Sequence, residues 1–240
     1  MNAFDARNRR NIARMTRDAA LARAARSWFN ASLKYEYLHH FTWLGLPIIQ
    51  APQDVVAMQE LVWADKPDLI VETGVARGGS VVFYASLLEL LGRGRVVGID
   101  IAIRKANRTA IERHPLSRRI TLIDGSSTDP AVVRRVHAMA RRAKRTLVVL
   151  DSNHTHDHVS AELEAYAPLI KPGGHLVVFD TVIDSIPAAM CRNRPWSKGN
   201  SPASAVRAFL KTHPGFAPDH DIEDKLLVTA APGGFLKRLR

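Results

Sequence analysis

The chain has 240 residues, of which 46% are hydrophobic and 24% are charged, and it contains one cysteine. A chain of this length can bury a core without disulfide or metal staples, and a single cysteine excludes an intrachain disulfide. The formal net charge of +11 is typical of nucleic-acid-binding proteins, but the arginines lie in alanine-rich helical stretches without interleaved aromatic residues. We therefore expect one main domain in the cytoplasm, with no nucleic acid as partner and no transmembrane segment.

Residues 1–40 are predicted to form an N-terminal helical appendage. Apolar residues recur near helical spacing from Ile12 to Phe29, and arginines fill the positions between them. These arginines indicate solvated helix faces or, as the next alternative, a basic surface for an anionic substrate or a membrane. The appendage is expected to cap the site, to pack against another subunit of a homo-oligomer, or to be partly disordered before Trp28.

Residues 41–240 are predicted to form one α/β domain, in which a helix begins near Pro52. Short apolar strands then alternate with helices, and this pattern is typical of a doubly wound, mostly parallel, Rossmann-like sheet. The predicted strands are residues 68–72, 95–100, 120–123, 146–150 and 175–180, and the predicted helices are 80–91, 105–113, 130–144 and 159–169.

The last part of the chain departs from this alternation. Residues 183–202 are rich in Pro, Arg, Asn and Ser and too long for an ordinary connection, which favours a functional lid. A helix is predicted over 203–212. Residues 225–230 and 234–237 are expected to form a closing strand pair around the turn Pro232-Gly233.

The first turn of the α/β region reads Glu72-x-Gly74-x-x-x-Gly78-Gly79-Ser80. Ligands of open α/β sheets bind at the carboxyl ends of the strands, and glycine lets the backbone approach a ligand closely. The spacing differs from the Gly-x-Gly-x-x-Gly of dinucleotide-binding folds. An acidic Glu72 would repel phosphates and suits the cationic amino-acid end of S-adenosylmethionine.

Two further strand ends support a cofactor site. Asp100 ends the second strand, where it can accept hydrogen bonds from ribose hydroxyls. Gly125 and Ser126 follow the third strand in the segment Asp124-Gly125-Ser126. The glycine-rich turn alone is equally typical of an ordinary connection between strand and helix, so the prediction of a cofactor site depends on all three strand ends.

These motifs resemble class I S-adenosylmethionine-dependent methyltransferases. More narrowly, the chain resembles the cephalosporin hydroxylase-like family, which includes metal-dependent O-methyltransferases acting on sugars. The segments that carry this resemblance are Trp43-Leu44-Gly45, Gln50, Lys66-Pro67-Asp68, Asp151-Ser152-Asn153-His154 and Lys225-Leu226-Leu227-Val228-Thr229. It covers about residues 40–240 and leaves the N-terminal helix unexplained.

The resemblance implies a divalent cation between Asp151, after the fourth strand, and Asp180, after the fifth. Oxygen ligands suit Mg²⁺, and Asp151 is also expected among the cofactor-binding and catalytic residues. Related enzymes often carry Glu-Asp where this chain has Phe179-Asp180. Because Phe179 cannot ligate, we expect fewer anionic ligands, with Thr181 as a neutral substitute.

The resemblance also implies that His154 is the catalytic base. A sugar hydroxyl is a poor nucleophile until a metal lowers its pKa and an imidazole can take its proton. The alternative for His154 is a capping or surface role, with His156 as the next candidate base. For the substrate we consider Trp196, on which a sugar could stack, and Arg192 and Arg194, which could hold a phosphate or uronate; the alternative is a mobile polar loop.

We therefore predict an enzyme that transfers a methyl group from S-adenosylmethionine to a hydroxyl of a glycan or nucleotide-linked sugar. Two alternatives stay open at this point. The acceptor could be a catechol-like or antibiotic small molecule, or the chain could be an inactive, basic protein of the same fold that binds RNA or an anionic membrane.

Overall fold

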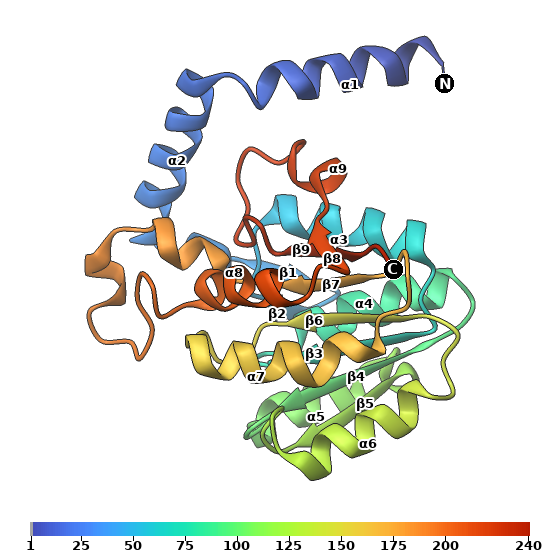
Figure 1. The fold of residues 1–240 in the computed structure, drawn as a ribbon. Helices are drawn as coiled ribbons and strands as arrows, with labels where there is room; N and C mark the ends of the chain where they lie inside the picture. The colour runs from blue at the N-terminus through green and yellow to red at the C-terminus, as the bar shows by residue number, and fades with distance from the viewer. Residues whose placement is uncertain (1) are drawn as a thin grey trace.

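The central feature of the computed structural model, which describes residues 2–240, is a seven-stranded sheet (Figure 1). Five strands are parallel, whereas β9 is antiparallel to both of its neighbours. The first strand of this sheet along the chain is β3, and later strands are added on both sides of it. The doubly wound α/β class predicted from the sequence is therefore confirmed. In spatial order the strands are β5 (Ile120–Asp124), β4 (Arg95–Asp100), β3 (Leu69–Thr73), β6 (Thr146–Leu150), β7 (His175–Val178), β9 (Phe235–Arg238) and β8 (Phe216–Pro218).

Helices cover both faces of the sheet and create two apolar cores. Successive residues of β3 alternate between them: Ile70 belongs to one core and Val71 to the other, and both are fully buried. Strands buried on both faces need continuous apolar runs, which is the pattern seen in the sequence. The first core includes residues of α3 (Pro52–Asp65), α4 (Gly79–Leu90) and α5 (Lys105–Arg113), and the second includes residues of α6 (Pro130–Ala140), α7 (His156–Tyr166) and α8 (Pro202–Thr212).

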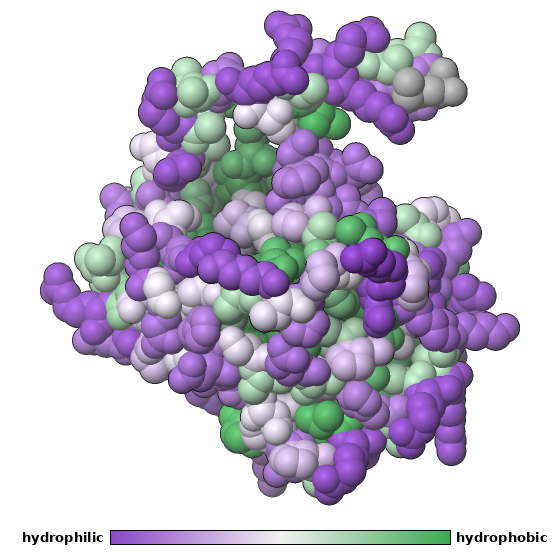
Figure 2. Space-filling model, in the orientation of Figure 1, coloured by the Kyte–Doolittle hydropathy of each residue, from purple (hydrophilic) through white to green (hydrophobic). Residues whose placement is uncertain are grey.

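The N-terminal segment forms two helices, α1 (Ala3–Met15) and α2 (Ala19–Leu33). Asp18 separates them, because its carboxylate accepts hydrogen bonds from the first backbone amides of α2. No residue of α1 is buried, and Phe29 is the buried residue of α2. Figure 1 shows α2 rising from the domain and α1 extending across its top, and Figure 2 shows that the exposed surface of α1 is largely hydrophilic. Among residues 2–240, no helix combines the length and apolar character needed to cross a membrane.

We call α1 and α2 together the arm. Between the arm and α3, the first helix of the core, the structure contains regular elements that the sequence pattern does not predict. A 3-10 turn, η1 (Tyr37–His39), leads into a small hairpin of β1 (Phe41–Trp43) and β2 (Leu46–Ile48). Leu44 and Gly45 connect the strands with positive φ angles of 46° and 91°, which suit a two-residue hairpin turn.

The predicted closing strand pair is wrong in its first member. Residues 225–230 form no strand, and β9 pairs instead with β7 and with β8, which the sequence pattern did not reveal. The physical reason is a competing partner: the backbone amide of Ala230 donates to the buried carboxylate of Asp54 at 2.7 Å, and the amide of Ala231 donates to the Thr229 hydroxyl. Both amides are therefore unavailable to a hairpin ladder.

The segment predicted as a lid contains short turns rather than regular elements. These are η4 (Thr181–Ser185), η5 (Ala188–Cys191) and a bridge between Ser197 and Asn200. Asp184 holds the segment together by accepting hydrogen bonds from the Gly199 amide, the Ser201 hydroxyl and the Arg207 guanidinium. Asn200 in turn accepts the backbone amide of His156 at the start of α7. Movement of this segment as a lid stays a prediction, as does the domain boundary between residues 40 and 41.

At the amino ends of the parallel strands, opposite the strand ends that carry the motifs, His175 joins three elements. Its Nδ1 lies 2.7 Å from Asp65 at the end of α3, and its Nε2 lies 2.9 Å from Asp219, which caps α9 (His220–Glu223). Burial alone would lower the pKa of His175, but the hydrogen bonds and negative charges of the two aspartates outweigh it and raise the pKa. Lys237 also faces Asp219, at 3.4 Å. A protonated His175 therefore clamps α3, β7 and α9.

We expect His175→Gln to lower the free energy of unfolding by about 1–3 kcal/mol near pH 5.5, the usual contribution of charged hydrogen bonds. Because the pKa of His175 is raised in the folded state, this stabilisation is fully present below the unfolded-state value and is lost as the pH rises through the folded-state value. Urea unfolding of both proteins at about pH 5.5 and about pH 9 measures the difference.

The control for this prediction is His220→Gln, because the His220 side chain is 73% exposed and lies 3.9 Å from Asp224. Exposed pairs contribute little, so this change should cost no more than about 0.5 kcal/mol. A loss for His175→Gln that is the same at both pH values would contradict a protonated clamp.

Candidate active site

A cavity of about 560 Å³ lies at the carboxyl ends of the parallel strands, where ligands of this fold class bind. Its walls come from the ends of β3, β4, β5 and β6 and from the segment after η5, and its lining includes Gly74, Asp100, Ser126, Asn153, His154, Arg194 and Trp196. The volume lies within the usual range for small-molecule sites. Five residues predicted from the sequence to be functional besides Asp100 therefore share one cavity, namely Gly74, Ser126, His154, Arg194 and Trp196.

Gly74 lets the ends of β3 and β6 approach each other. Its φ angle is +91°, and a Cβ placed on it would lie 2.0 Å from the backbone oxygen of Asp151. The amide of Asp151 donates to the carbonyl of Thr73 at 2.9 Å, and the amide of Gly74 donates to Ile99 at 2.8 Å. Only glycine is compatible with this contact, which fixes where Asp151 leaves the sheet.

Asp100 organises the glycine-rich turn as well as lining the cavity. Its Oδ2 accepts the backbone amides of Val75 and Ala76 at 3.0 and 3.2 Å, and its Oδ1 accepts the amide of Ala102 at 3.1 Å. Oδ1, which accepts one hydrogen bond, has a further lone pair available. The contact with ribose stays a prediction, and the structure adds a second task for the same side chain.

Glu72 does not line the cavity, although the sequence analysis expected it at the ligand. It is fully buried, and burial, followed by the charge of Asp100, raises its pKa to about 8. A second, smaller cavity of about 40 Å³ lies nearby and is lined by Gln50, Gly74, Gly78, Ser80 and Asp151 among others. The predicted residues Gly78 and Ser80 therefore line this smaller space. Gly125 lines neither cavity, and a Cβ there would meet Val132.

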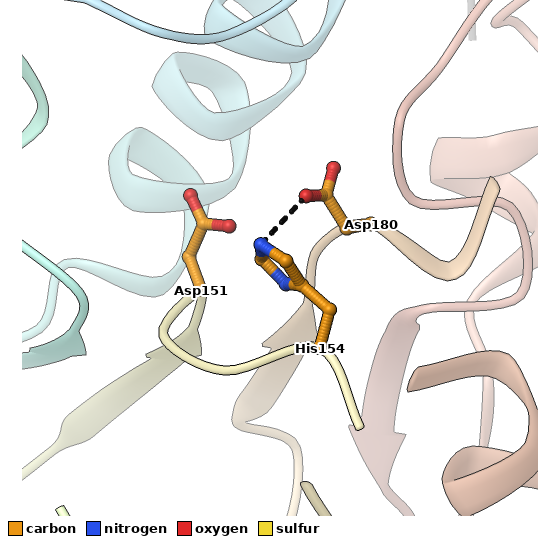
Figure 3. Close-up of side chains that lie close together, drawn as sticks. All are labelled: Asp151, His154 and Asp180. Carbon is orange, nitrogen blue, oxygen red and sulfur yellow. Dashed lines mark ion pairs between the residues drawn. The ribbon is translucent and has the colours of Figure 1, made fainter. Parts of the chain in front are cut away.

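Asp151, His154 and Asp180 come together, as Figure 3 shows. One ligand atom from each lies within 4.8 Å of the others, and His154 Nε2 is 3.1 Å from Asp180 Oδ2. Burial, followed by the charges of Asp180 and Glu72, raises the pKa of Asp151. Two carboxylates this close repel each other, so a bound cation would relieve the repulsion. The donor set therefore fits a divalent cation.

Both neighbours of Asp180 in the chain are buried. The Phe179 side chain is buried and packs edge-to-face against Phe235, with ring centroids 6.4 Å apart. Thr181 is also buried, and its hydroxyl donates to the carbonyl of Pro232 at 2.8 Å. The hydroxyl is therefore already used as a donor, and its role as a substitute ligand stays a prediction.

The loop residues proposed as substrate contacts separate into two places. Trp196 lies edge-on to the His154 ring, with the two ring centroids 5.8 Å apart. The Arg194 guanidinium lies 5.7 Å from the Trp196 ring centroid. Both line the main cavity, whereas Arg192 lines a different one. His156, the second candidate base, contacts the Ser204 hydroxyl of α8 through Nδ1 at 2.8 Å and does not line the main cavity.

Comparison with known proteins identifies the family of this chain. A sequence model described as rhamnosyl O-methyltransferase/CmcI matches residues 35–239. The chain belongs to this family. The family predicted from the sequence is thereby confirmed, and with it the prediction of an O-methyltransferase.

The relatives include named enzymes. The chain is 28% identical to a rhamnosyl O-methyltransferase of Mycobacterium bovis over 222 residues, covering 91% of this chain and 85% of the relative. It is 29% identical to a rhamnosyl O-methyltransferase of Mycobacterium leprae over 201 residues, covering 82% of each chain.

Solved structures share the fold. A structure of CmcI with Mg and S-adenosylmethionine has a TM-score of 0.58 at 18% identity, covering 84% of this chain and 78% of that one. A structure of the mycinamycin methyltransferase MycE with Mg and S-adenosylhomocysteine has a TM-score of 0.51 at 19% identity, covering 86% of this chain and 53% of that one.

A polar network that the sequence pattern did not reveal lies in the cavity wall. His158 Nε2 lies 3.0 Å from the Ser127 hydroxyl and 3.3 Å from the Ser152 hydroxyl, and Ser152 donates to the fully buried Glu162 at 2.7 Å. Ser127, Ser152 and His158 all line the cavity. The sequence contains a signal for this network, because His158 and Glu162 are four residues apart and therefore lie on one helix face.

We expect Gly74→Ala to destabilise the fold far more than Gly45→Ala. Both glycines have a φ of +91°, but a Cβ on Gly45 meets no atom of residues 2–240 within 4 Å. The cost at Gly45 is backbone strain alone, about 1 kcal/mol, whereas at Gly74 the backbone must move and the cost should reach about 3 kcal/mol or more. Urea unfolding measures both, and equal losses would contradict the role assigned to the contact with Asp151.

Proposed function

We propose that the protein transfers a methyl group from S-adenosylmethionine to a saccharide hydroxyl, with a divalent cation at Asp151 and Asp180. The observation that carries the proposal is the cluster of Asp151, His154 and Asp180 beside the glycine-rich turn. Membership of the rhamnosyl O-methyltransferase/CmcI family supports a sugar acceptor, as do the names of the mycobacterial relatives. We propose a cytoplasmic location as well, following the sequence analysis.

The cofactor would occupy the main cavity and extend toward the smaller one. Asp100 and Ser126 line the main cavity, where the ribose would bind, and Gln50 and Ser80 line the smaller cavity, where the amino-acid end would lie. Both amide atoms of Gln50 are buried without a hydrogen-bond partner in the described part of the chain, so a polar group is needed there. S-adenosylmethionine supplies the electrophilic methyl group.

The cation would be held by the carboxylates of Asp151 and Asp180, and Mg²⁺ is the best match to two hard oxygen donors. When bound, it lowers the pKa of the acceptor hydroxyl. With Phe179 turned into the core, two carboxylates supply all of the anionic charge in the cluster.

His154 is the proposed base. The proton of the acceptor hydroxyl moves to Nε2, the ring nitrogen that faces the two carboxylates, and Asp180 at 3.1 Å stabilises the imidazolium that results. Trp196 packs edge-on to the ring and fixes its orientation. Trp196 and Arg194 also cover the cavity from the side of the loop and exclude water from the reacting groups.

The metal requirement is tested with Asp151→Asn. Because one of two anionic ligands is lost, we expect Mn²⁺ binding, measured by electron paramagnetic resonance, to weaken by about tenfold or more, while calorimetry shows retained S-adenosylhomocysteine binding. Methyl transfer to an alkyl rhamnoside, followed by mass spectrometry, should stop in the variant and in chelator-treated wild type. Transfer that survives chelation would contradict the cation, and transfer to catechols but not to glycosides would contradict the saccharide acceptor.

The role of His154 is tested by His154→Gln against His156→Gln. Loss of a general base should lower kcat by about 10²–10⁴-fold, whereas His156→Gln removes a contact with Ser204 and should change kcat by no more than about threefold. Mn²⁺ affinity should be unchanged in His154→Gln. If it falls by about tenfold or more instead, His154 is a ligand of the cation and not the base.

A further inference from the structure

A second large cavity, of about 640 Å³, lies between α2 and the segment of residues 183–198. Three cationic side chains line it, namely Arg26 from α2 and Arg192 and Lys198 from the loop. None of the three forms an ion pair or donates a side-chain hydrogen bond within residues 2–240. Their charges are therefore free to attract an anion.

The carboxylate that also lines this cavity does not neutralise them. Asp184 already accepts hydrogen bonds from Ser201, from the Gly199 amide at 3.0 Å and from Arg207 at 2.6 Å. Burial opposes its ionisation, but these hydrogen bonds and the charge of Arg207 lower its pKa, so it stays ionised and paired. The cavity thus keeps an excess of positive charge.

The chain runs from the proposed acceptor site directly into the lining of this cavity. Ile183, Asp184 and Ser185 line it, and they belong to η4, which begins directly after Asp180. Short stretches of chain therefore link the carboxylate cluster to residues that line this cavity.

We propose that this cavity binds a phosphate group of the acceptor, so that the substrate is a phosphate-linked sugar. The assignment of the phosphate to the acceptor rests on the proposed function, whereas binding of phosphate in this cavity does not depend on it. Arginine presents a planar pair of donors that matches phosphate oxygens, and Lys198 adds a third, flexible charge. Arg26 gives α2 a direct part in substrate binding.

The test uses inorganic pyrophosphate with the full chain, in the presence of a chelator, so that the carboxylate cluster takes no part. Calorimetry should detect binding to the wild type, and Arg192→Gln and Arg26→Gln should each weaken it by about tenfold. Arg23→Gln is the matched control, because Arg23 is an exposed arginine of α2 that does not line the cavity; its affinity should stay within about twofold of the wild type.

Cys191 provides a second readout, because it is the only cysteine and lines the same cavity. Pyrophosphate should slow the reaction of its thiol with neutral iodoacetamide in the wild type, compared with sodium chloride of equal ionic strength, and should do so much less in Arg192→Gln. Absence of binding, or equal binding by the wild type and both cavity variants, would overturn the proposal.

The source of the phosphate is resolved by two further probes. A nucleotide diphosphate sugar that competes with pyrophosphate indicates a nucleotide-linked acceptor, whereas competition by phosphatidylglycerol vesicles indicates a lipid-linked one. Competition by neither probe would overturn the assignment to a phosphate-linked sugar. None of these measurements involves methyl transfer, so failure of the proposed reaction and failure of this cavity to bind phosphate are observed separately.

Discussion

The contact between Gly74 and the backbone of Asp151 is the constraint on which the site depends. The strand order reverses between β3 and β6, and at this point the chain after β3 must turn toward α4 while the chain after β6 turns toward α7. A glycine at φ +91° lets the two backbones touch. This places the glycine-rich turn and the first acidic residue of the cluster side by side, so the proposed cofactor and cation sites share one rigid junction. Preorganisation of this kind is where much of the rate of a group transfer originates.

The cost of this arrangement is an accumulation of buried negative charge. Burial raises the pKa of Asp54 to about 6 and that of Glu72 to about 8, and it raises the pKa of Asp151 as well. Asp180 adds to the repulsion at both aspartates. Oxygen atoms of Asp54 and Glu72 also lack hydrogen-bond partners in the described residues. A sulfonium cofactor and a divalent cation both bring positive charge to this region, so the protein is organised around ligands that complete its electrostatics.

Much of this could be predicted from the sequence, because each sheet strand from β3 to β7 is a local apolar run and each strand end is marked by a polar residue. Asp151, His154 and Asp180 follow directly from that rule and from the family resemblance. Side-chain direction could not be predicted: Phe179 and Thr181 flank Asp180, yet both point into packed surroundings. The same holds for Glu72, which the motif placed at the ligand but which is fully buried and lines neither the main nor the smaller cavity.

Long-range pairing was equally hidden. The segment 225–230 has a strand-like composition, but a single buried carboxylate 176 residues away in the chain, that of Asp54, takes the amide of Ala230. No local pattern contains that information. The antiparallel partner of β7 is therefore β9, which in turn accepts β8 at the edge of the sheet.

The parts of the chain outside the sheet line two separate cavities. Arg194 and Trp196 close the main cavity over His154, whereas Arg192, only two residues earlier, joins Arg26 around the second cavity. The loop of residues 192–198 therefore borders both cavities. The arm contributes Arg26 to the cavity that residues of η4 also line. The sheet fixes the reacting groups, and the loop and the arm are free to vary with the acceptor, because neither carries the backbone contacts that hold Asp151 and Gly74 together. Specificity and chemistry can then change independently in this fold.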